Sequence, residues 1–404
     1  MLLENQQTLQ NSVKPHGAIA PLGTKTKSSP PPDQKSELPH REKLQELRSK
    51  RYELLASARS IYCQQGASQG LQFVQNYHRT AKCKYVPTGS LVGVHASQKH
   101  HSAFYTGLVS CGSVWTCAVC AVKIQERRRL EIEKAINFGY ANGLQSVLVT
   151  LTFPHYKMHR LSELLIKQAD ALARLRKGKQ WDLFKNDINF QGLIRALELT
   201  YGENGWHPHT HELWFVDKNA TLDDLIKTVK NKWWVACLKA GLVKLSDKNK
   251  FYEYAVDIKM NCSTGDYLAK QDSSKHWGAD REMAKASSKI GKSSGLHPFA
   301  FLTEEHKDSD KWIEFTKAIK GKSQLFWSRG LKDKFNIEEK TDEQLAEEEN
   351  DEADLLGMLT LDQWKLIRQH NKRTHILDIV ENSKSLEFAW RDIKLLLFNL
   401  KKLE

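Results

Sequence analysis

The stretch Leu197-Glu-Leu-Thr-Tyr-Gly-Glu-Asn-Gly-Trp-His-Pro-His-Thr-His-Glu-Leu-Trp-Phe215 predicts a β-hairpin. Two runs rich in β-prone residues flank Asn204-Gly205, a pair that is typical of tight hairpin turns. Three histidines occupy alternate positions of the outgoing run: His207, His209 and His211. Because alternate residues of a strand share one face, we expect these imidazoles to project together.

The loop length decides where Glu198 lies. A two-residue loop at Asn204-Gly205 pairs Glu198 with His211, and a four-residue loop over 202–205 pairs it with His209. Both registers place the carboxylate on the histidine face, whereas a three-residue loop points it away. Two imidazoles and one carboxylate can bind a divalent cation and leave positions open for substrate. We therefore predict metal ligands at His209, His211 and Glu198; the alternative is the polar outer face of a surface hairpin.

The composition favours a polyanionic partner. The chain has 404 residues and a formal charge of +13, with 61 Lys and Arg against 48 Asp and Glu. Nucleic acid is a more natural partner than a membrane for such a protein, although a generic basic protein is the alternative. No apolar run of about 18 residues and no signal-peptide core is present. The 7 cysteines do not suggest a disulfide scaffold, so a reducing, cytoplasmic setting is expected.

A cysteine cluster precedes the hairpin in the run Cys111-Gly-Ser-Val-Trp-Thr-Cys117-Ala-Val-Cys120. Thiolates at this spacing can hold a structural Zn²⁺, which needs a fourth ligand to complete its tetrahedron. The candidates for that ligand are Cys83, the nearest cysteine upstream, and three histidines: His95, His100 and His101. A redox pair and buried free thiols are the alternatives.

A helix is expected to begin around Val122. It carries four basic residues: Lys123, Arg127, Arg128 and Arg129. Such a basic face suits DNA phosphates, and a solvated surface is the alternative.

The hydrophobic periodicity predicts an α+β fold with four regions. Residues 1–40 are predicted to be a disordered tail, and 41–140 a helical and Cys-containing, zinc-type DNA-binding region. Residues 141–335 alternate strands and helices in the order β-α-β-β-α-β-α, which predicts a ferredoxin-like antiparallel sheet with flanking helices. Residues 336–404 are predicted to be an acidic linker followed by C-terminal helices. The last strand of the sheet is expected over 251–260, and the last helix over 266–271.

Three motifs, in order, give the chain a resemblance to a known family. They are Val149-Thr-Leu-Thr152, Gly205-Trp-His-Pro-His-Thr-His211, and Tyr267 with Lys270 in a Tyr-x-x-Lys pattern. The chain resembles the HUH endonucleases and, within them, the rolling-circle plasmid replication initiators. The cysteine region up to Arg129 and the segment from Trp312 to Leu331 are also similar to this group, so the resemblance covers about residues 100–335.

The resemblance implies a DNA nicking-closing enzyme. Tyr267 would attack the scissile phosphate and form a 5′-phosphotyrosine, while Mg²⁺ or Mn²⁺ is held by the histidine–glutamate ligands. Lys270 would contact a phosphate oxygen from the same helix face, and Arg127, Arg128 and Lys270 would bind DNA. The substrate would be a replication origin, single-stranded or extruded at the nick. A host helicase would then take part, and a host polymerase would extend the released 3′-OH.

The chain also departs from the family pattern. Thr210 stands between the paired histidines, where the family usually has a bulky hydrophobic residue. Ser263 stands where some initiators have a carboxylate for a terminating cleavage, and Asp266 lies next to the tyrosine instead. Tyr252 and Tyr254, on the strand predicted over 251–260, are weaker candidates for the nucleophile.

Two alternative functions stay open. One is an HUH transposase or relaxase. The other is a zinc-dependent DNA-binding regulator without catalysis, in which Tyr267 would be structural.

Overall fold

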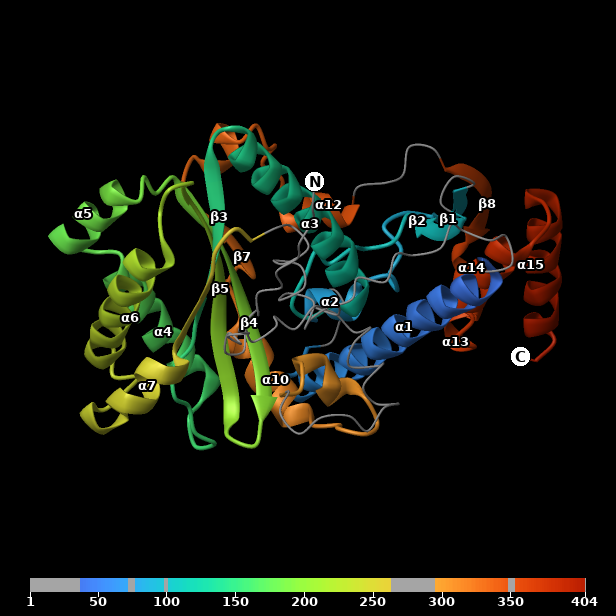
Figure 1. Cartoon of the computed structure of the whole chain (residues 1–404). Helices are drawn as coiled ribbons and strands as arrows, with labels where there is room; N and C mark the ends of the chain where they lie inside the picture. Colours follow the sequence, from blue (N-terminus) through green and yellow to red (C-terminus); the bar gives the residue numbers. More distant parts are fainter. Residues whose placement is uncertain (1–36, 72–76, 98–100, 263–294, 348–352, 404) are drawn as a thin grey trace, which may run out of the picture. The chain divides into compact units, whose positions relative to one another are not determined.

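Two antiparallel sheets carry the fold of the computed structural model, which describes residues 37–71, 77–97, 101–262, 295–347 and 353–403 (Figure 1). The described residues from 43 onward belong to one compact unit. The tail predicted over 1–40 lies almost entirely outside the described residues. The helix predicted over 266–271 also lies outside them.

The larger sheet has five strands in the order β6-β3-β5-β4-β7. The strands are β3 (Leu144–Leu151), β4 (Gly192–Gly202), β5 (Gly205–Asp217), β6 (Val256–Lys259) and β7 (Leu325–Trp327). β3 and β4 are each antiparallel to β5, which lies between them, so they run parallel to each other. Because helices connect β3 to β4 while β5 lies between these two strands, this is a split β-α-β arrangement. The predicted antiparallel sheet with flanking helices is confirmed.

Helices cover both faces of this sheet. α4 (Leu161–Leu175) and α6 (Leu222–Lys239) pack against each other on one face, and α3 (Ala118–Ala141) lies on the other (Figure 1). The alternation along β3 explains the two layers: Val147 and Val149 join the core under α4 and α6, whereas Leu148 joins the α3 core.

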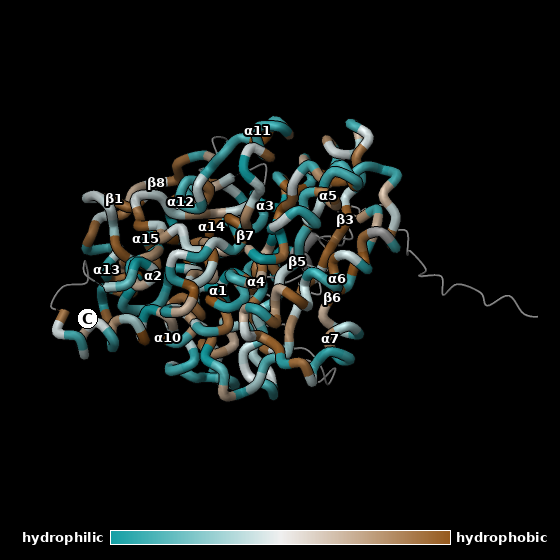
Figure 2. The backbone as a smooth tube through the Cα atoms, turned by 90° about the vertical axis from the view of Figure 1, so that its left-hand side faces the viewer, coloured by the Kyte–Doolittle hydropathy of each residue, from teal (hydrophilic) through white to brown (hydrophobic). Residues whose placement is uncertain are grey.

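Helix α4 is the first of the helices that the alternating pattern over 141–335 predicts. Its apolar residues recur at helical spacing and are all buried: Leu161, Leu164, Leu165, Leu172 and Leu175. Strand β3 is buried on both faces and is brown in the hydropathy colouring of Figure 2, whereas α5 (Lys179–Asp187) and α11 (Leu331–Lys334) are mostly teal.

The smaller sheet joins the cysteine region to the C-terminal region. Its order is β2-β1-β8, formed by β1 (Leu91–Ser97), β2 (Ser102–Thr106) and β8 (Asp354–Thr360). The C-terminal helices are present as expected: α13 (Leu361–Gln369), α14 (Arg373–Asn382) and α15 (Leu386–Lys401). β8 was not predicted, and neither was the docking of the acidic segment, where α12 (Asp342–Glu347) buries Leu345 and Ala346 against α3.

The strand predicted over 251–260 is wrong in its first half. Residues Lys248–Tyr254 form helix α7, after the 3-10 helix η3 (Leu245–Asp247), and only β6 is extended. Phe251 is buried against Trp234, so tertiary packing outweighs the β propensity of its aromatic neighbours. Tyr252 and Tyr254 therefore lie on a helix.

The remaining described elements complete the chain. They are α1 (Glu37–Ser68), α2 (Arg79–Lys82), the 3-10 helix η4 (Pro298–Leu302) and α10 (Ser309–Ala318). Among the described residues, no helix combines the length and apolar character needed to cross a bilayer.

Candidate metal centre

The hairpin formed by β4 and β5 has the register that pairs Glu198 with His209. Gly202 pairs with Gly205, so the turn residues are 203 and 204, and the predicted Asn204-Gly205 turn is off by one residue. Gly205 has φ +83°, and a Cβ atom there would lie 2.9 Å from Lys157 Cα. The positive φ and the close approach of Lys157 both require a glycine at position 205, where the second strand of the hairpin begins.

Three side chains converge on the sheet face on which α3 lies, since His209 and His211 share the face of β5 that carries Leu213 and Phe215 of the α3 core. The Glu198 carboxylate oxygen Oε2 lies 2.9 Å from His209 Nε2 and 3.0 Å from His211 Nε2. The three ligand atoms lie within 4.8 Å of one another, and the side chains are only 10–19% exposed. One carboxylate and two imidazole nitrogens at this spacing can hold one divalent ion.

Neighbouring groups orient both imidazoles. His211 Nδ1 lies 3.1 Å from Thr150 Oγ1, and His209 Nδ1 lies 3.4 Å from the carbonyl oxygen of His207. With the Nδ1 atoms turned to these partners, both Nε2 atoms face the carboxylate, as metal-ligating histidines require.

His207 belongs to a different cluster. Its Nε2 lies 2.7 Å from Thr152 Oγ1, and its ring stacks on His155 at 4.4 Å between centroids. Burial, together with the neighbouring His209, lowers the pKa of His207 to about 3, so its ring is neutral at neutral pH. His207 therefore flanks the ligand cluster as an uncharged group.

The ligand cluster is charged in a way that suits a cation. Burial opposes ionisation of Glu198, but its hydrogen bonds with His209 and His211 outweigh this and hold its pKa below the ordinary value. Burial likewise lowers the pKa of His209, but the Glu198 carboxylate outweighs it and raises that pKa. The carboxylate thus favours positive charge on the His209 ring, and a bound cation would take the place of that charge.

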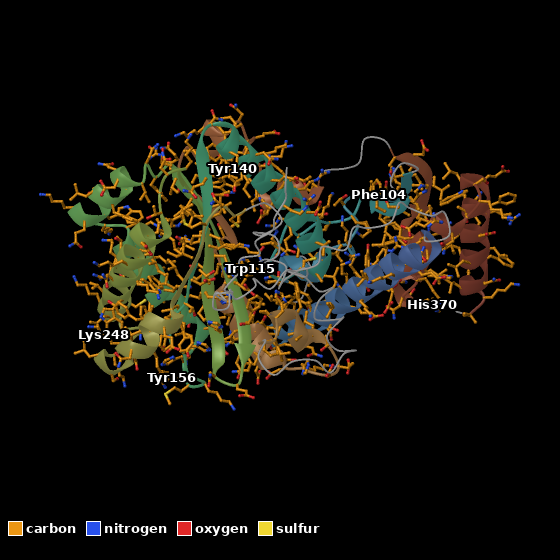
Figure 3. The ribbon with its side chains drawn as sticks, viewed as in Figure 1. Phe104, Trp115, Tyr140, Tyr156, Lys248 and His370 are labelled. Carbon is orange, nitrogen blue, oxygen red and sulfur yellow. The ribbon has the colours of Figure 1, made fainter. Side chains whose placement is uncertain are left out.

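Tyr267 and Lys270 lie outside the described residues. The last described residue before them, Cys262, donates its backbone N–H to the Ser146 carbonyl of β3 at 2.8 Å. Its own carbonyl accepts from Tyr140, which Figure 3 labels on α3. After the gap, Leu296 pairs with Tyr201 of β4. Both flanks of 263–294 are thus anchored to the sheet that carries the histidines.

The cysteine cluster is assembled from Cys83, Cys111, Cys117 and Cys120, all buried. The Cys83 sulfur lies 3.5 Å from that of Cys120 and 3.6 Å from that of Cys117, and the Cys111 sulfur lies 3.8 Å from that of Cys120. A tetrahedron with Zn–S bonds of about 2.3 Å has sulfur–sulfur edges of about 3.8 Å. Four sulfurs thus fit a zinc ion, with Cys83 in the fourth position.

The histidine alternatives do not join this cluster in the described part of the chain. His95 Nε2 lies 2.9 Å from Thr106 Oγ1 within the smaller sheet. His101 lies in a turn with φ 44°, and His100 is outside the described residues. Burial raises the pKa of the Cys117 thiol, whereas hydrogen bonds from the neighbouring cysteines lower the pKa of the Cys120 thiol. The cluster thus favours negative charge on Cys120, and a bound cation would compensate that charge.

The basic face of α3 is partly used within the molecule. Arg128 forms ion pairs with Glu131 and Asp342, and Arg129 pairs with Glu126 and Glu133. Arg127 is exposed on the same helix. Arg127 is therefore better placed than Arg128 to meet a DNA phosphate.

Sequence reasoning missed three members of the site's surroundings: Thr150, Thr152 and His155. The available signal was the alternation in Val149-Thr-Leu-Thr152, which places both threonines on one face of β3. What the sequence lacked was the pairing of Thr150 with His211, which only the β3–β5 register supplies.

Comparison with known proteins places the chain among replication proteins. A family model described as Replication protein matches residues 109–373. Protein rep of Streptomyces lividans is 25% identical over 319 residues, covering 62% of this chain and 67% of the relative. A Neomycin resistance protein of Streptomyces cyanogenus is 31% identical over 137 residues, covering 28% of this chain and 31% of the relative. No solved structure matches.

Proposed function

The chain belongs to the Replication protein family, a family of plasmid replication initiators, and we propose that it starts rolling-circle replication by nicking one strand of its origin. The resemblance to plasmid initiators is thereby confirmed. Strand cutting and rejoining through tyrosine, an HUH-type site and metal dependence are the proposal. The observation that carries it is the convergence of Glu198, His209 and His211 on one sheet face.

The ligand set suits phosphate chemistry. Mg²⁺ or Mn²⁺ held by this carboxylate and these two imidazoles would supply Lewis-acid polarisation of a phosphate oxygen. Thr150 and the His207 carbonyl hold the two rings so that their Nε2 atoms stay directed at the ion's position. His207, neutral and half-buried, adds no charge that would repel the ion.

We propose Tyr267 as the nucleophile. Its phenolic oxygen would attack the scissile phosphorus as the bond from phosphorus to the 3′ oxygen breaks. The tyrosine proton is lost to solvent and the departing 3′ oxygen gains one. The product is a 5′-phosphotyrosine and a free 3′-OH, so the number of phosphate ester bonds is unchanged and no ATP is needed. A later attack by a 3′-OH on the phosphotyrosine would rejoin the strand.

Chain reach supports this assignment. Tyr267 is five residues beyond Cys262, a distance that an extended chain spans over about 17 Å. Cys262 is bonded to Ser146, and Thr150 of the metal site is four residues farther along β3, about 13 Å away. Lys270 would neutralise a phosphate oxygen, Arg127 would hold the DNA backbone, and the four cysteines would hold a structural Zn²⁺.

A denaturing gel tests the proposal. The protein is incubated with Mn²⁺ and a labelled single-stranded oligonucleotide from the origin of its own replicon, beside the variants Tyr267→Phe and His211→Ala. We expect a covalent protein–DNA band that needs the metal and is lost in both variants.

Two other outcomes would overturn parts of the proposal. A band that survives Tyr267→Phe would move the nucleophile to another tyrosine. Binding to the origin without any band would instead indicate a DNA-binding regulator without catalysis.

A further inference from the structure

A cationic cavity of about 600 Å³ lies on the sheet face opposite to the histidines. α4 lines one wall, and β4, β5 and the segment around β7 line the other. Four of the described lining residues are cationic and none is acidic; the cations are Arg176, Arg195, Lys322 and Arg329. The volume is in the range of ordinary ligand pockets, and the charge selects for an anion.

Of the arginines that line the cavity, Arg176 forms an ion pair with a carboxylate, whereas Arg195 forms none with any residue that the structure describes. The buried Glu212 carboxylate accepts from Arg176 and, at 2.8 Å, from Trp214 Nε1. Arg195 lies opposite Glu212 in the β4–β5 pairing and is attracted by its charge, but within the described part of the chain the Arg195 guanidinium has no hydrogen bond. It stacks on the Phe326 ring, 4.6 Å from its centroid. A guanidinium in this state is ready to bind an anion such as phosphate through two parallel hydrogen bonds.

Buried polar atoms beside the arginines also lack partners. Gln168 and Thr210 are 2% and 1% exposed and line the cavity, yet Gln168 Nε2 and Thr210 Oγ1 have no hydrogen-bond partner among the residues that the structure describes. The buried Arg176 Nε has none either. Unpaired donors are costly in a protein interior, so their grouping in one cavity points to an acceptor-rich ligand.

Aromatic side chains supply a platform. Phe326 is 43% exposed and carries the Arg195 guanidinium on its face, and Trp181 and Phe190 line the inner wall. Planar heterocycles stack well on arginine and aromatic faces, as nucleobases do in single-strand binding proteins. Phosphate charge, hydrogen-bond acceptors and a planar ring occur together in a nucleotide.

We propose that this cavity binds a nucleoside phosphate, either a free nucleotide or one nucleotide unit of a single strand. Arg195 and Arg329 would hold the phosphate, and Gln168 and Thr210 would bond the base or sugar. Thr210 lies between His209 and His211 on β5 and faces the opposite way, so the ligand would contact the back of the strand that carries the metal ligands.

Equilibrium binding of dTTP and of a fluorescent oligothymidylate of about eight nucleotides, the length of one single-strand site, tests this inference on the full chain. The variants are Arg195→Gln, which removes the charge, and Ala173→Phe, which fills the exposed rim. The control is Arg174→Gln. Arg174 follows Ala173 on helix α4, but it pairs with Asp170 and does not line the cavity. We expect both test variants to weaken binding at least tenfold and the control to leave it unchanged.

The two probes distinguish the sources. Variant-sensitive binding of dTTP identifies a free nucleotide as the ligand, and variant-sensitive binding of the oligonucleotide alone identifies a unit of the strand. Failure of both probes at millimolar concentration, or binding that both test variants retain, overturns the inference. Neither result depends on covalent adduct formation, so the cavity and the nicking proposal fail separately. Ala173→Phe changes an exposed position, which keeps the test valid if Arg195→Gln does not fold.

Discussion

Glu198 links the two histidine ligands, and this single carboxylate decides how the site responds to pH. Because Glu198 raises the pKa of His209, that imidazole keeps a proton to a higher pH than usual. The proton must leave before Nε2 can bind a metal. In the metal-free protein the ion pair stabilises the fold below the unfolded pKa of His209, and this contribution is lost as pH rises through the folded pKa.

We predict that the apparent affinity for Mn²⁺ rises with pH until His209 has lost its proton, which happens at a higher pH than for an ordinary histidine. Calorimetric titration of the protein with Mn²⁺ measures it. Glu198→Gln should weaken binding more than tenfold and flatten the pH dependence. Glu203→Gln, an exposed carboxylate in the same hairpin turn, is the matched control and should change neither. Affinity that is independent of pH would argue against His209 as a ligand.

At the residue scale the sequence placed Glu198, His209 and His211 on one face but left two pairings of Glu198 open, of which the structure has the one with His209. Period-two alternation is a property of any strand, so it placed His209 and His211 together without knowledge of the fold. The partner of Glu198 depended on the turn, and glycines at both Gly202 and Gly205 allowed more than one loop. The fourth cysteine was open for a similar reason, because Cys83 reaches the cluster only through tertiary packing.

Helix α1 is held to the C-terminal region by Arg48. Its guanidinium binds Glu381 of α14, with one contact at 2.9 Å, and also Asp378. Glu381 in turn accepts the backbone N–H of Ala103 in β2 at 2.8 Å. The Arg48 and Glu381 side chains are only 14% and 7% exposed. Removing either side chain would therefore leave the charge of the other without its partner in a site that water hardly reaches.

Arg48→Ala should therefore lower the free energy of unfolding by about 2 kcal/mol. Lys50→Ala is the control on the same helix, since Lys50 forms an exposed pair with Glu46 and should cost under about 0.5 kcal/mol. Urea denaturation of both variants makes the comparison. Equal effects would show that the Arg48 network does not hold α1 in place.

The docking of α12 depends on Gly112. This residue has φ +60°, and a Cβ atom on it would lie 2.8 Å from the backbone Cα of Glu343. Gly112→Ala should push α12 away from the cysteine loop and destabilise the protein by about 2 kcal/mol or more. Gly241→Ala shares the positive φ but has open space around it, so its smaller loss isolates the cost of the clash. The measurement is the melting temperature of each variant. Equal decreases in Gly112→Ala and Gly241→Ala would contradict a clash with α12.

At the element scale, strong periodicity was predictive and short mixed segments were not. Helix α4 was found because its leucines repeat at helical spacing over the whole element. α7 was mistaken for a strand because its aromatic residues carry β propensity, while the buried contact of Phe251 with Trp234 favours a helix. β8 follows an acidic segment and pairs with β1, some 260 residues earlier, a contact that no local pattern encodes.

On the scale of the whole molecule, the four cysteines tie α2 and the start of α3 to one point. We predict that elemental analysis finds about one zinc per chain. The variant Cys117→Ser should lose this zinc and melt at a lower temperature than the wild-type protein. Cys63→Ser is the control, because Cys63 lies on α1 outside the cluster and should keep both the zinc and the stability. A wild-type protein without zinc that melts as Cys117→Ser does would contradict a structural metal.

The order of elements was largely predictable at this scale, but their association was not. The alternating strands and helices of the central region gave the sheet and its flanking helices. The smaller sheet combines strands from the cysteine region and from the C-terminal region, which the sequence treats as separate. Its formation depends on burial of residues such as Trp364 and Ile393 against β1 and β2, a property of the packed chain.

The most direct test of the central claim is the rate of strand cleavage on an origin oligonucleotide whose scissile phosphate carries one sulfur. If a metal at Glu198, His209 and His211 contacts that phosphate, one of the two sulfur diastereomers should be cut at least tenfold more slowly with Mg²⁺, because Mg²⁺ prefers oxygen ligands. The softer Mn²⁺ should restore the rate. Equal rates for both diastereomers with both metals would contradict a metal–phosphate contact at this site.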